Sequence, residues 1–187
     1  TYAGNLESLA DIEANPNYRL MKADICDVKT LKSSIEDFKP TSVINFAAES
    51  HVDRSIDCPA VFIETNIIGT YNLLECSRDF LIKQPNYFSD KFRFIHVSTD
   101  EVYGSLSAEG YFSEDTPYAP NSPYAASKAS SDHLARAWYR TYKVPVITSN
   151  CSNNYGPYQF PEKLIPVAIY SALEGKPIPV YGQGSNI

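Results

Sequence analysis

The sequence is poor in the residues that most often bind metals. Its 187 residues include four cysteines and three histidines, and the cysteines are scattered with no Cys-x-x-Cys pair. Zinc sites in proteins use closely spaced pairs of such ligands. We therefore expect no metal site, and we interpret the cysteines as reduced thiols of a cytoplasmic protein.

Long apolar runs and positive charge are also scarce. A membrane-spanning helix needs about 20 consecutive apolar residues, and no such run is present. Lys and Arg total 16 against 22 Asp and Glu, which gives a net charge of −6. Because nucleic-acid binding requires a basic face, we expect neither a membrane nor a nucleic acid as partner. A small anionic ligand remains compatible, since a few local cations can override the global charge.

Both ends of the chain lack a recognisable terminal element. The first residue is Thr1, no basic and then apolar leader follows it, and the last residues are polar and glycine-rich. We therefore expect an internal part of a longer protein.

Short runs of β-branched residues alternate along the chain with helical patterns. We predict strands at residues 18–23, 42–47, 92–98 and 144–148, with the second of them buried. Predicted helices begin after Asp27, at Pro59, at Ser122 (to about residue 142) and at residue 164 (to residue 174), and Gly175 ends the last. Leu31, Ile35 and Phe38 form the apolar face of the first helix. This alternation predicts a doubly wound α/β fold with a parallel sheet, whose ligands bind beyond the carboxyl ends of the strands.

Two carboxylates stand at the end of the third predicted strand. Asp100 and Glu101 follow Thr99 directly after residues 92–98. A pair of acids can divide the work of catalysis, with one ionised as a base and the other protonated as an acid. A solvated loop would also explain them, but their position at a strand end favours function.

Tyr124 and Lys128 stand four residues apart near a predicted helix start, so their side chains share one face. A neighbouring ammonium favours the phenolate and lowers the pKa of a tyrosine. The pair could thus accept a proton from a hydroxyl group while hydride leaves the same carbon. Spacing alone is weak evidence, because a surface helix carries such a pair by chance.

Other polar or small residues follow predicted strands. Ala47, Ala48 and Ser50 would let a flat cofactor approach the backbone, and Arg54 is a candidate for a phosphate. The run 152–157, with Lys163 beyond it, could contact a hydroxylated ligand. His96 sits inside an apolar strand and is interpreted as a core histidine.

The chain resembles the extended short-chain dehydrogenase/reductase family. The resemblance covers the whole chain and is carried by residues 1–6, 24–25, 47–55, 98–104, 122–128 and 150–157. It implies a Rossmann-like α/β fold that is incomplete at both ends. Residues 1–150 correspond to an NAD-binding domain without its first βαβ unit and glycine-rich loop, and residues 151–187 begin the sugar-nucleotide lobe.

Within the family, the acidic pair implies dehydration of dTDP-glucose to the 4-keto-6-deoxy sugar, a lyase reaction. Tyr124, helped by Lys128, would take the proton of the 4-hydroxyl group while NAD accepts hydride, and Thr99 would bind the 4-keto oxygen. Glu101 would remove the proton of carbon 5, and Asp100 would protonate the departing 6-hydroxyl group.

The same matching implies which residues contact the ligands and how the protein assembles. It implies a homodimer that pairs through the two long helices containing Ile67 and His133. The residues implied to contact NAD are Thr1, Asp24, Ile25, Ala47, Ala48, Ser50, Thr65, Tyr124, Lys128 and Asn154, and those implied to contact the substrate are Ser50, Thr99, Asn153, Lys163, Leu164, Pro179 and Tyr181.

Three alternatives stay open. A 4,6-dehydratase acting on a UDP-sugar would carry similar residues, because the nucleotide base is poorly resolved by the sequence. A sugar-nucleotide 4-epimerase would share Tyr124 and Lys128, but Asp100 and Glu101 speak against it. This chain could also be a non-catalytic part that cannot hold NAD by itself.

Overall fold

Three short strands and the helices between them form the larger part of the chain. A computed structural model describes residues 2–85, 91–106 and 110–180. The chain divides into two compact units: a large unit, Lys22–Ser152, and a small unit, Thr1–Met21 with Asn153–Ile187.

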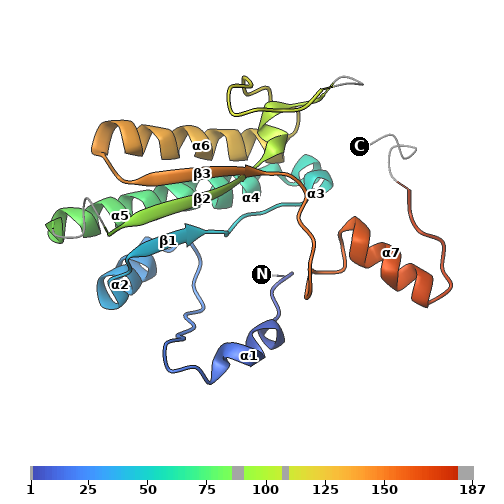
Figure 1. Ribbon diagram of the computed structural model, residues 1–187, viewed down its shortest axis with the longest axis horizontal. Coiled ribbons are helices and arrows are strands. Elements are labelled where there is room, and N and C mark those ends of the chain that lie inside the picture. The colour runs from blue at the N-terminus through green and yellow to red at the C-terminus, as the bar shows by residue number, and fades with distance from the viewer. Residues whose placement is uncertain (1, 86–90, 107–109, 181–187) are drawn as a thin grey trace. The chain divides into compact units, whose positions relative to one another are not determined.

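The strands of the large unit are β1 (Ser42–Asn45), β2 (Arg93–Thr99) and β3 (Val146–Cys151). They form a parallel sheet in the order β1-β2-β3, and Figure 1 shows their carboxyl ends at one edge. Its helices are α2 (Val28–Phe38), α3 (Val52–Asp57), α4 (Pro59–Phe62), the π-helix η2 (Ile63–Gly69), α5 (Thr70–Lys83), the 3₁₀ helix η4 (Asp100–Tyr103) and α6 (Pro123–Tyr142). The predicted α/β class with a parallel sheet is confirmed.

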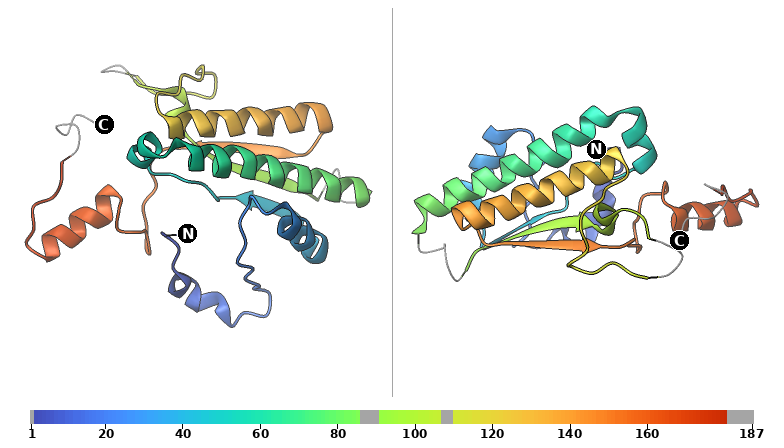
Figure 2. Two further views of the ribbon diagram at one scale, coloured as in Figure 1. Left: turned by 180° about the vertical axis from the view of Figure 1, so that it is seen from behind. Right: turned by 90° about the horizontal axis from the view of Figure 1, so that it is seen from above.

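The long helices α2, α5 and α6 lie on one face of the sheet (Figure 2). Side chains alternate across each strand, so Phe94 faces the helices and Ile44 and Ile147, each 51% exposed, face away. One core fills the covered face, and it consists of Leu31, Ile35, Leu73, Leu74, Cys76, Phe80, Leu81, Phe92, Phe94 and Val144. In the part of the chain that the structure describes, the other face of the sheet carries no long helix.

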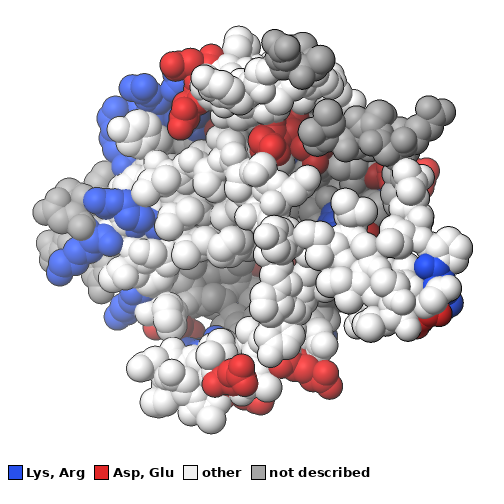
Figure 3. Space-filling model, turned by 45° about the vertical axis from the view of Figure 1, so that its right-hand side comes forward, with Lys and Arg blue, Asp and Glu red and all other residues white. Residues whose placement is uncertain are grey.

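Capping residues mark the ends of the long helices α2 and α6. Asp27 caps α2 by accepting a hydrogen bond from the amide of Thr30, and Ser122 caps α6 through the amide of Ala125. Lys39 and Lys143 end these helices with positive φ angles of 51° and 61°. Basic side chains gather at the end where α5 and α6 terminate (Figure 3, left), which complements the negative end of each helix dipole.

Several predictions about the strands and helices need correction. Residues 18–23 form no strand, because an extended segment becomes a strand only through a ladder and they pair with no described neighbour. The strand at residues 42–47 ends at Asn45 and is only partly buried, since Ile44 lies on the uncovered face. Phe38 is 64% exposed, because α2 packs through Leu31 and Ile35 alone. The last strand starts two residues later than predicted and runs to Cys151.

The small unit contains the 3₁₀ helix η1 (Leu6–Leu9), α1 (Ala10–Glu13) and α7 (Leu164–Leu173). Helix α7 matches the prediction, and Gly175 follows it with a φ of +64°. Tyr2 joins the beginning of this unit to its later part: its hydroxyl donates to Glu162 at 3.0 Å, and its ring meets that of Phe160 edge to face. Among the described residues, no helix is both long enough and apolar enough to span a membrane.

Candidate active site

Thr99, Asp100 and Glu101 form the tip of β2 and the turn that follows it. Thr99 is the last strand residue and caps the 3₁₀ helix η4 by accepting a hydrogen bond from the amide of Glu101 at 3.3 Å. Its hydroxyl also lies 3.3 Å from a carboxylate oxygen of Asp100, as donor. One threonine therefore bonds to both acidic residues at the carboxyl end of the central strand, to the carboxylate of Asp100 and to the backbone amide of Glu101.

Tyr124 lies in the first turn of α6 and faces this strand tip. Its side chain is 9% exposed, packs edge to face against Phe62, and is hydrogen-bonded to Thr99. The structure thus brings Tyr124 to the same strand end as the two acids.

The pKa of Tyr124 is raised to about 12, mainly by burial and then by the negative charge of Glu101. The side-chain hydrogen bond between Tyr124 and Thr99 lowers this pKa by a smaller amount. The sequence predicted a lowered pKa from the ammonium of Lys128. Burial and Glu101 dominate instead, and Tyr124 keeps its proton at neutral pH.

Lys128 is buried one turn further along α6, with 4% exposure. Its ammonium donates to the carbonyl oxygen of Val97 at 2.7 Å, which ties α6 to β2 two residues before Thr99. Burial lowers the pKa of Lys128, while the charge of Asp132 acts in the opposite direction.

The π-helix η2 gathers several of the residues predicted to contact NAD. Thr65 lies within it and is half-buried. Ile25 packs so closely on Gly69 that an added Cβ there would meet its Cδ1 at 2.4 Å. Asp24 stabilises the turn that contains Ile25, because its side chain accepts a hydrogen bond from the amide of Cys26 at 2.8 Å.

Asn66 connects η2 to two further parts of the site. Its amide nitrogen donates to the carbonyl of Glu49 and to the hydroxyl of Ser127, and its oxygen accepts from the amide of Glu49, all within 2.9 Å. Glu49 belongs to the loop after β1 that includes Ala47, Ala48 and Ser50, and Ser127 lies between Tyr124 and Lys128. Asn66 was not predicted from the sequence, although it stands four positions after Phe62 and so on the same helix face as that apolar residue.

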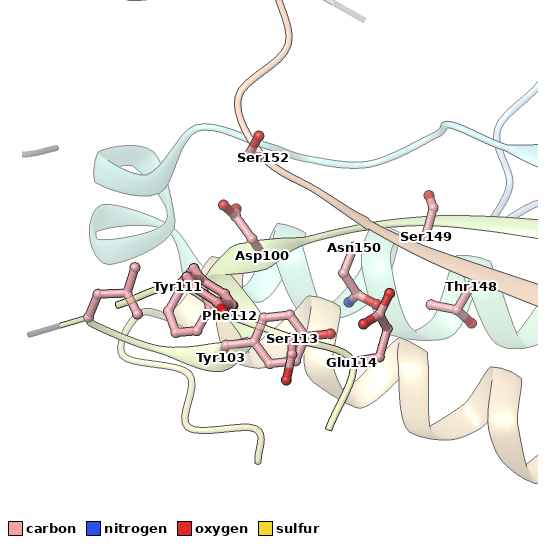
Figure 4. A pocket seen from close by; sticks show the side chains of 11 residues that line it. Asp100, Tyr103, Tyr111, Phe112, Ser113, Glu114, Thr148, Ser149, Asn150 and Ser152 are labelled. Atoms are coloured by element: carbon pink, nitrogen blue, oxygen red, sulfur yellow. The ribbon is translucent and has the colours of Figure 1, made fainter. Parts of the chain in front are cut away.

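A hollow of about 530 Å³ opens at the ends of β2 and β3 (Figure 4). Asp100 projects into it beside Asn150 and Ser152, and the rings of Tyr103, Tyr111 and Phe112 line one side. Of the five predicted catalytic residues only Asp100 lines this hollow. The others meet along the adjoining face of α6.

The remaining predicted contacts belong to the small unit. Asn153 and Asn154 are exposed, and the carbonyl of Asn154 accepts a hydrogen bond from Gln159. Lys163 precedes the first turn of α7, where Leu164 is 71% exposed, and Pro179 is exposed. Thr1 and Tyr181 lie outside the described residues.

Three further side chains have structural contacts. His51 caps α3 by accepting from the amide of Arg54. Trp138 donates to Glu75 at 2.8 Å, and the exposed ring of His133 contacts Tyr118. In the ranges that the structure describes, no cluster of three His, Cys, Asp or Glu side chains could hold a metal.

His96 is fully buried in β2, as predicted for a core histidine. Its Nε2 lies 3.1 Å from the hydroxyl of Ser131 and 3.1 Å from Oδ1 of Asp132. The hydroxyl proton of Ser131 goes to the carbonyl of Lys128, so Nε2 is the donor and carries the ring proton. Burial, followed by the charge of Lys128, lowers the pKa of His96.

A parallel α/β sheet with Tyr124 and Lys128 beside the tip of its central strand defines the class of short-chain dehydrogenases/reductases. Within that class, the sequence model of the GDP-mannose 4,6 dehydratase family matches residues 1–187. The chain belongs to this family.

Individual relatives agree with this assignment. The chain is 58% identical over 187 residues to dTDP-glucose 4,6-dehydratase of Xanthomonas campestris, covering 100% of this chain and 53% of that protein. The crystal structure of dTDP-glucose 4,6-dehydratase from Streptomyces venezuelae with NAD bound is 48% identical, with a TM-score of 0.90 over 100% of this chain and 54% of that one. The chain thus spans about half the length of these relatives.

A more distant neighbour catalyses a different reaction. UDP-glucuronic acid 4-epimerase from Bacillus cereus, in complex with UDP-glucuronic acid and NAD, has a TM-score of 0.84 at 28% identity, covering 96% of this chain and 53% of that one. The fold is therefore shared between dehydratases and epimerases, and the residues of the site must separate them.

The buried histidine makes stability depend on pH. The unfolded chain takes up a proton on His96 below a pH of about 6.5, while the folded protein resists it, so stability falls as pH drops through that value. We expect His96→Gln to remove up to about 1.4 kcal/mol per pH unit of this dependence. Denaturant unfolding of the full-length protein between pH 7.5 and 5 measures it, and exposed His133→Gln is the matched control. An equal slope in both variants would show that His96 is not responsible.

Proposed function

We propose that the full-length protein carrying this chain is an NAD-dependent lyase that dehydrates dTDP-glucose to dTDP-4-keto-6-deoxyglucose. The observation that carries the proposal is the meeting of Thr99, Asp100 and Glu101 with Tyr124 at the end of β2. The identities of 58% and 48% to two dTDP-glucose 4,6-dehydratases support it, against 28% to an epimerase.

The residues around η2 fit NAD as cofactor. Ala47 and Ala48 offer backbone with little side chain at the end of β1, and the Ile25–Gly69 contact brings the turn at Asp24 against the same π-helix. Asp24, Ile25, Ala47, Ala48, Ser50 and Thr65 would hold the cofactor, with Tyr124 and Lys128 on α6. NAD would supply a reversible hydride acceptor that takes hydride from carbon 4 of the sugar and returns it to carbon 6 after water has left.

Three side chains then divide the proton transfers, and two more support them. Tyr124 takes the proton of the 4-hydroxyl group, and it needs positive charge for this because its pKa is about 12. Lys128, four residues along the same buried helix face, is the cation on its own element. Thr99 donates a hydrogen bond to the oxygen at carbon 4, Glu101 removes the proton of carbon 5, and Asp100 protonates the leaving 6-hydroxyl group.

The domain assignment is part of the proposal. Residues 1–150 form an NAD-binding domain of Rossmann type, and residues 151–187 begin a lobe for the sugar nucleotide. The boundary lies close to residue 152, where the compact large unit ends. Asn153, Asn154, Lys163, Leu164 and Pro179 would meet the ligands from that lobe. A cytoplasmic location is supported by the free state of all four cysteines.

Turnover of dTDP-glucose is the direct test of the substrate. Full-length protein incubated with dTDP-glucose should form the alkali-sensitive 4-keto-6-deoxy product, and UDP-glucose should be turned over far more slowly. Faster turnover of UDP-glucose would contradict the proposed dTDP-sugar substrate. Formation of the 4-epimer would contradict the proposed dehydration and indicate an epimerase.

Glu101→Gln should separate oxidation from elimination. The amide cannot accept the proton of carbon 5, so exchange of that hydrogen with deuterated solvent should fall by about 100-fold or more, while transient absorbance of reduced NAD still forms. The matched control is Glu114→Gln, an exposed carboxylate near Asp100 at the hollow. Exchange at the wild-type rate in Glu101→Gln would exclude Glu101 as the base.

A homodimer through the two long helical stretches completes the proposal. Val61, Ile68 and Tyr71 are 43%, 47% and 41% exposed on the stretch α4–η2–α5, which lies beside α6. Ile68→Glu should halve the mass measured by light scattering, because a charge would be buried in the interface. Ile56→Glu, at a 65% exposed isoleucine of α3, should leave the mass unchanged. A dimer that survives Ile68→Glu would contradict this surface.

A further inference from the structure

Asp132 is a buried carboxylate that the proposed reaction does not use. It lies on α6 one turn after Lys128 and two turns after Tyr124, and it is 4% exposed. An ionised group at such a position is strongly destabilising unless several donors and an opposite charge surround it.

Three donors from three separate segments converge on one oxygen of Asp132. The hydroxyl of Ser98 donates to Oδ2 at 2.8 Å, that of Tyr118 at 2.9 Å, and the side-chain amide of Asn150 lies at 3.3 Å. Ser98 immediately precedes Thr99, and Asn150 also lies within hydrogen-bond distance of the carbonyl of Thr99. Asp132 therefore connects β2, β3 and the loop before α6. The connection lies next to Thr99, the residue that directly precedes Asp100 and Glu101.

The other oxygen of Asp132 faces His96, which does not supply the opposite charge. His96 lies 3.1 Å from Oδ1, and its Nε2 proton points to acceptors on α6. Burial lowers the pKa of His96, so the ring is neutral. The ring is thus a neutral neighbour of Oδ1, which accepts no hydrogen bond in the described part of the structure.

Lys128 is the buried cation of α6 and stands four residues before Asp132; its ammonium donates to the carbonyl of Val97, and it interacts with the carboxylate through charge. It is buried on the same face of α6, and the charge of Asp132 is the largest influence that keeps its pKa up against burial. The other titratable groups around the two are Tyr118 and Tyr103, whose pKa values burial and Asp132 raise, and Cys151 on β3.

We propose that Asp132 is a positioning residue for the reaction: its carboxylate fixes the Thr99 strand tip against α6 and is the buried counter-charge of Lys128. This inference rests on the proposed function. It predicts that loss of the charge disturbs the pH dependence of catalysis, and that loss of a single neutral donor does not.

The test compares Asp132→Asn with Tyr118→Phe in the full-length protein. Asp132→Asn keeps the shape and removes the charge, and we expect kcat to fall by about 100-fold with little change in KM. The alkaline limb of its kcat profile should move to lower pH, because Lys128 loses its proton more easily. Tyr118→Phe removes one donor and should leave that limb in place.

Two readouts separate positioning from a loss of folded protein and from a wrong function. Bound NAD per protein gives the folded fraction, and a fall in kcat that merely follows this fraction, with an unchanged pH profile, would overturn the inference. NMR of ¹³C-lysine, with Lys128 assigned through Lys128→Met, measures its pKa without turnover. An unchanged pKa in Asp132→Asn would also overturn it, whereas a wild-type protein inactive on nucleotide sugars would refute the proposed function alone.

Discussion

The burial of charge along one face of α6 is the constraint on which the rest of the site depends. Tyr124, Lys128 and Asp132 follow one another at intervals of four residues and are all less than 10% exposed. Water cannot solvate them, so the sheet must provide their partners. The carbonyl of Val97 accepts a hydrogen bond from the ammonium of Lys128, and Ser98 and Asn150 donate to the carboxylate of Asp132. These bonds leave the ends of β2 and β3 little freedom relative to α6, and that fixes Thr99 beside Tyr124.

Asn66 is a buried polar group without charge, and it contacts α6 through Ser127. Its amide donates twice and accepts once, so a buried polar group is satisfied through three hydrogen bonds. It lies in a π-helix, a rare geometry that is frequent at functional sites. The loop after β1 is held through Asn66, and the turn at Ile25 is held through Gly69. One irregular turn thus arranges the segments that would hold NAD, while one charged helix face arranges those that would act on the sugar.

Local patterns in the sequence predicted much of this arrangement. Caps at Asp27 and Ser122 located α2 and α6, because a capping side chain acts on amides two or three residues away. The parallel topology placed Thr99, Asp100 and Glu101 at a ligand-binding edge. The false strand at residues 18–23 shows the limit, since a strand depends on a neighbour that composition does not reveal. The Asp132 network was missed for the same reason: its donors come from residues 98, 118 and 150.

The acidic pair that favours dehydration makes the first proton transfer harder. Glu101 is the second cause, after burial, of the raised pKa of Tyr124. The carboxylate that would remove the proton of carbon 5 therefore opposes the phenolate that would form first. An epimerase site without that acid does not face this conflict. A dehydratase needs more positive charge near its tyrosine, and Lys128 can supply it only while it stays protonated in a buried position. On this reasoning a buried counter-charge such as Asp132 is a requirement that Glu101 itself creates.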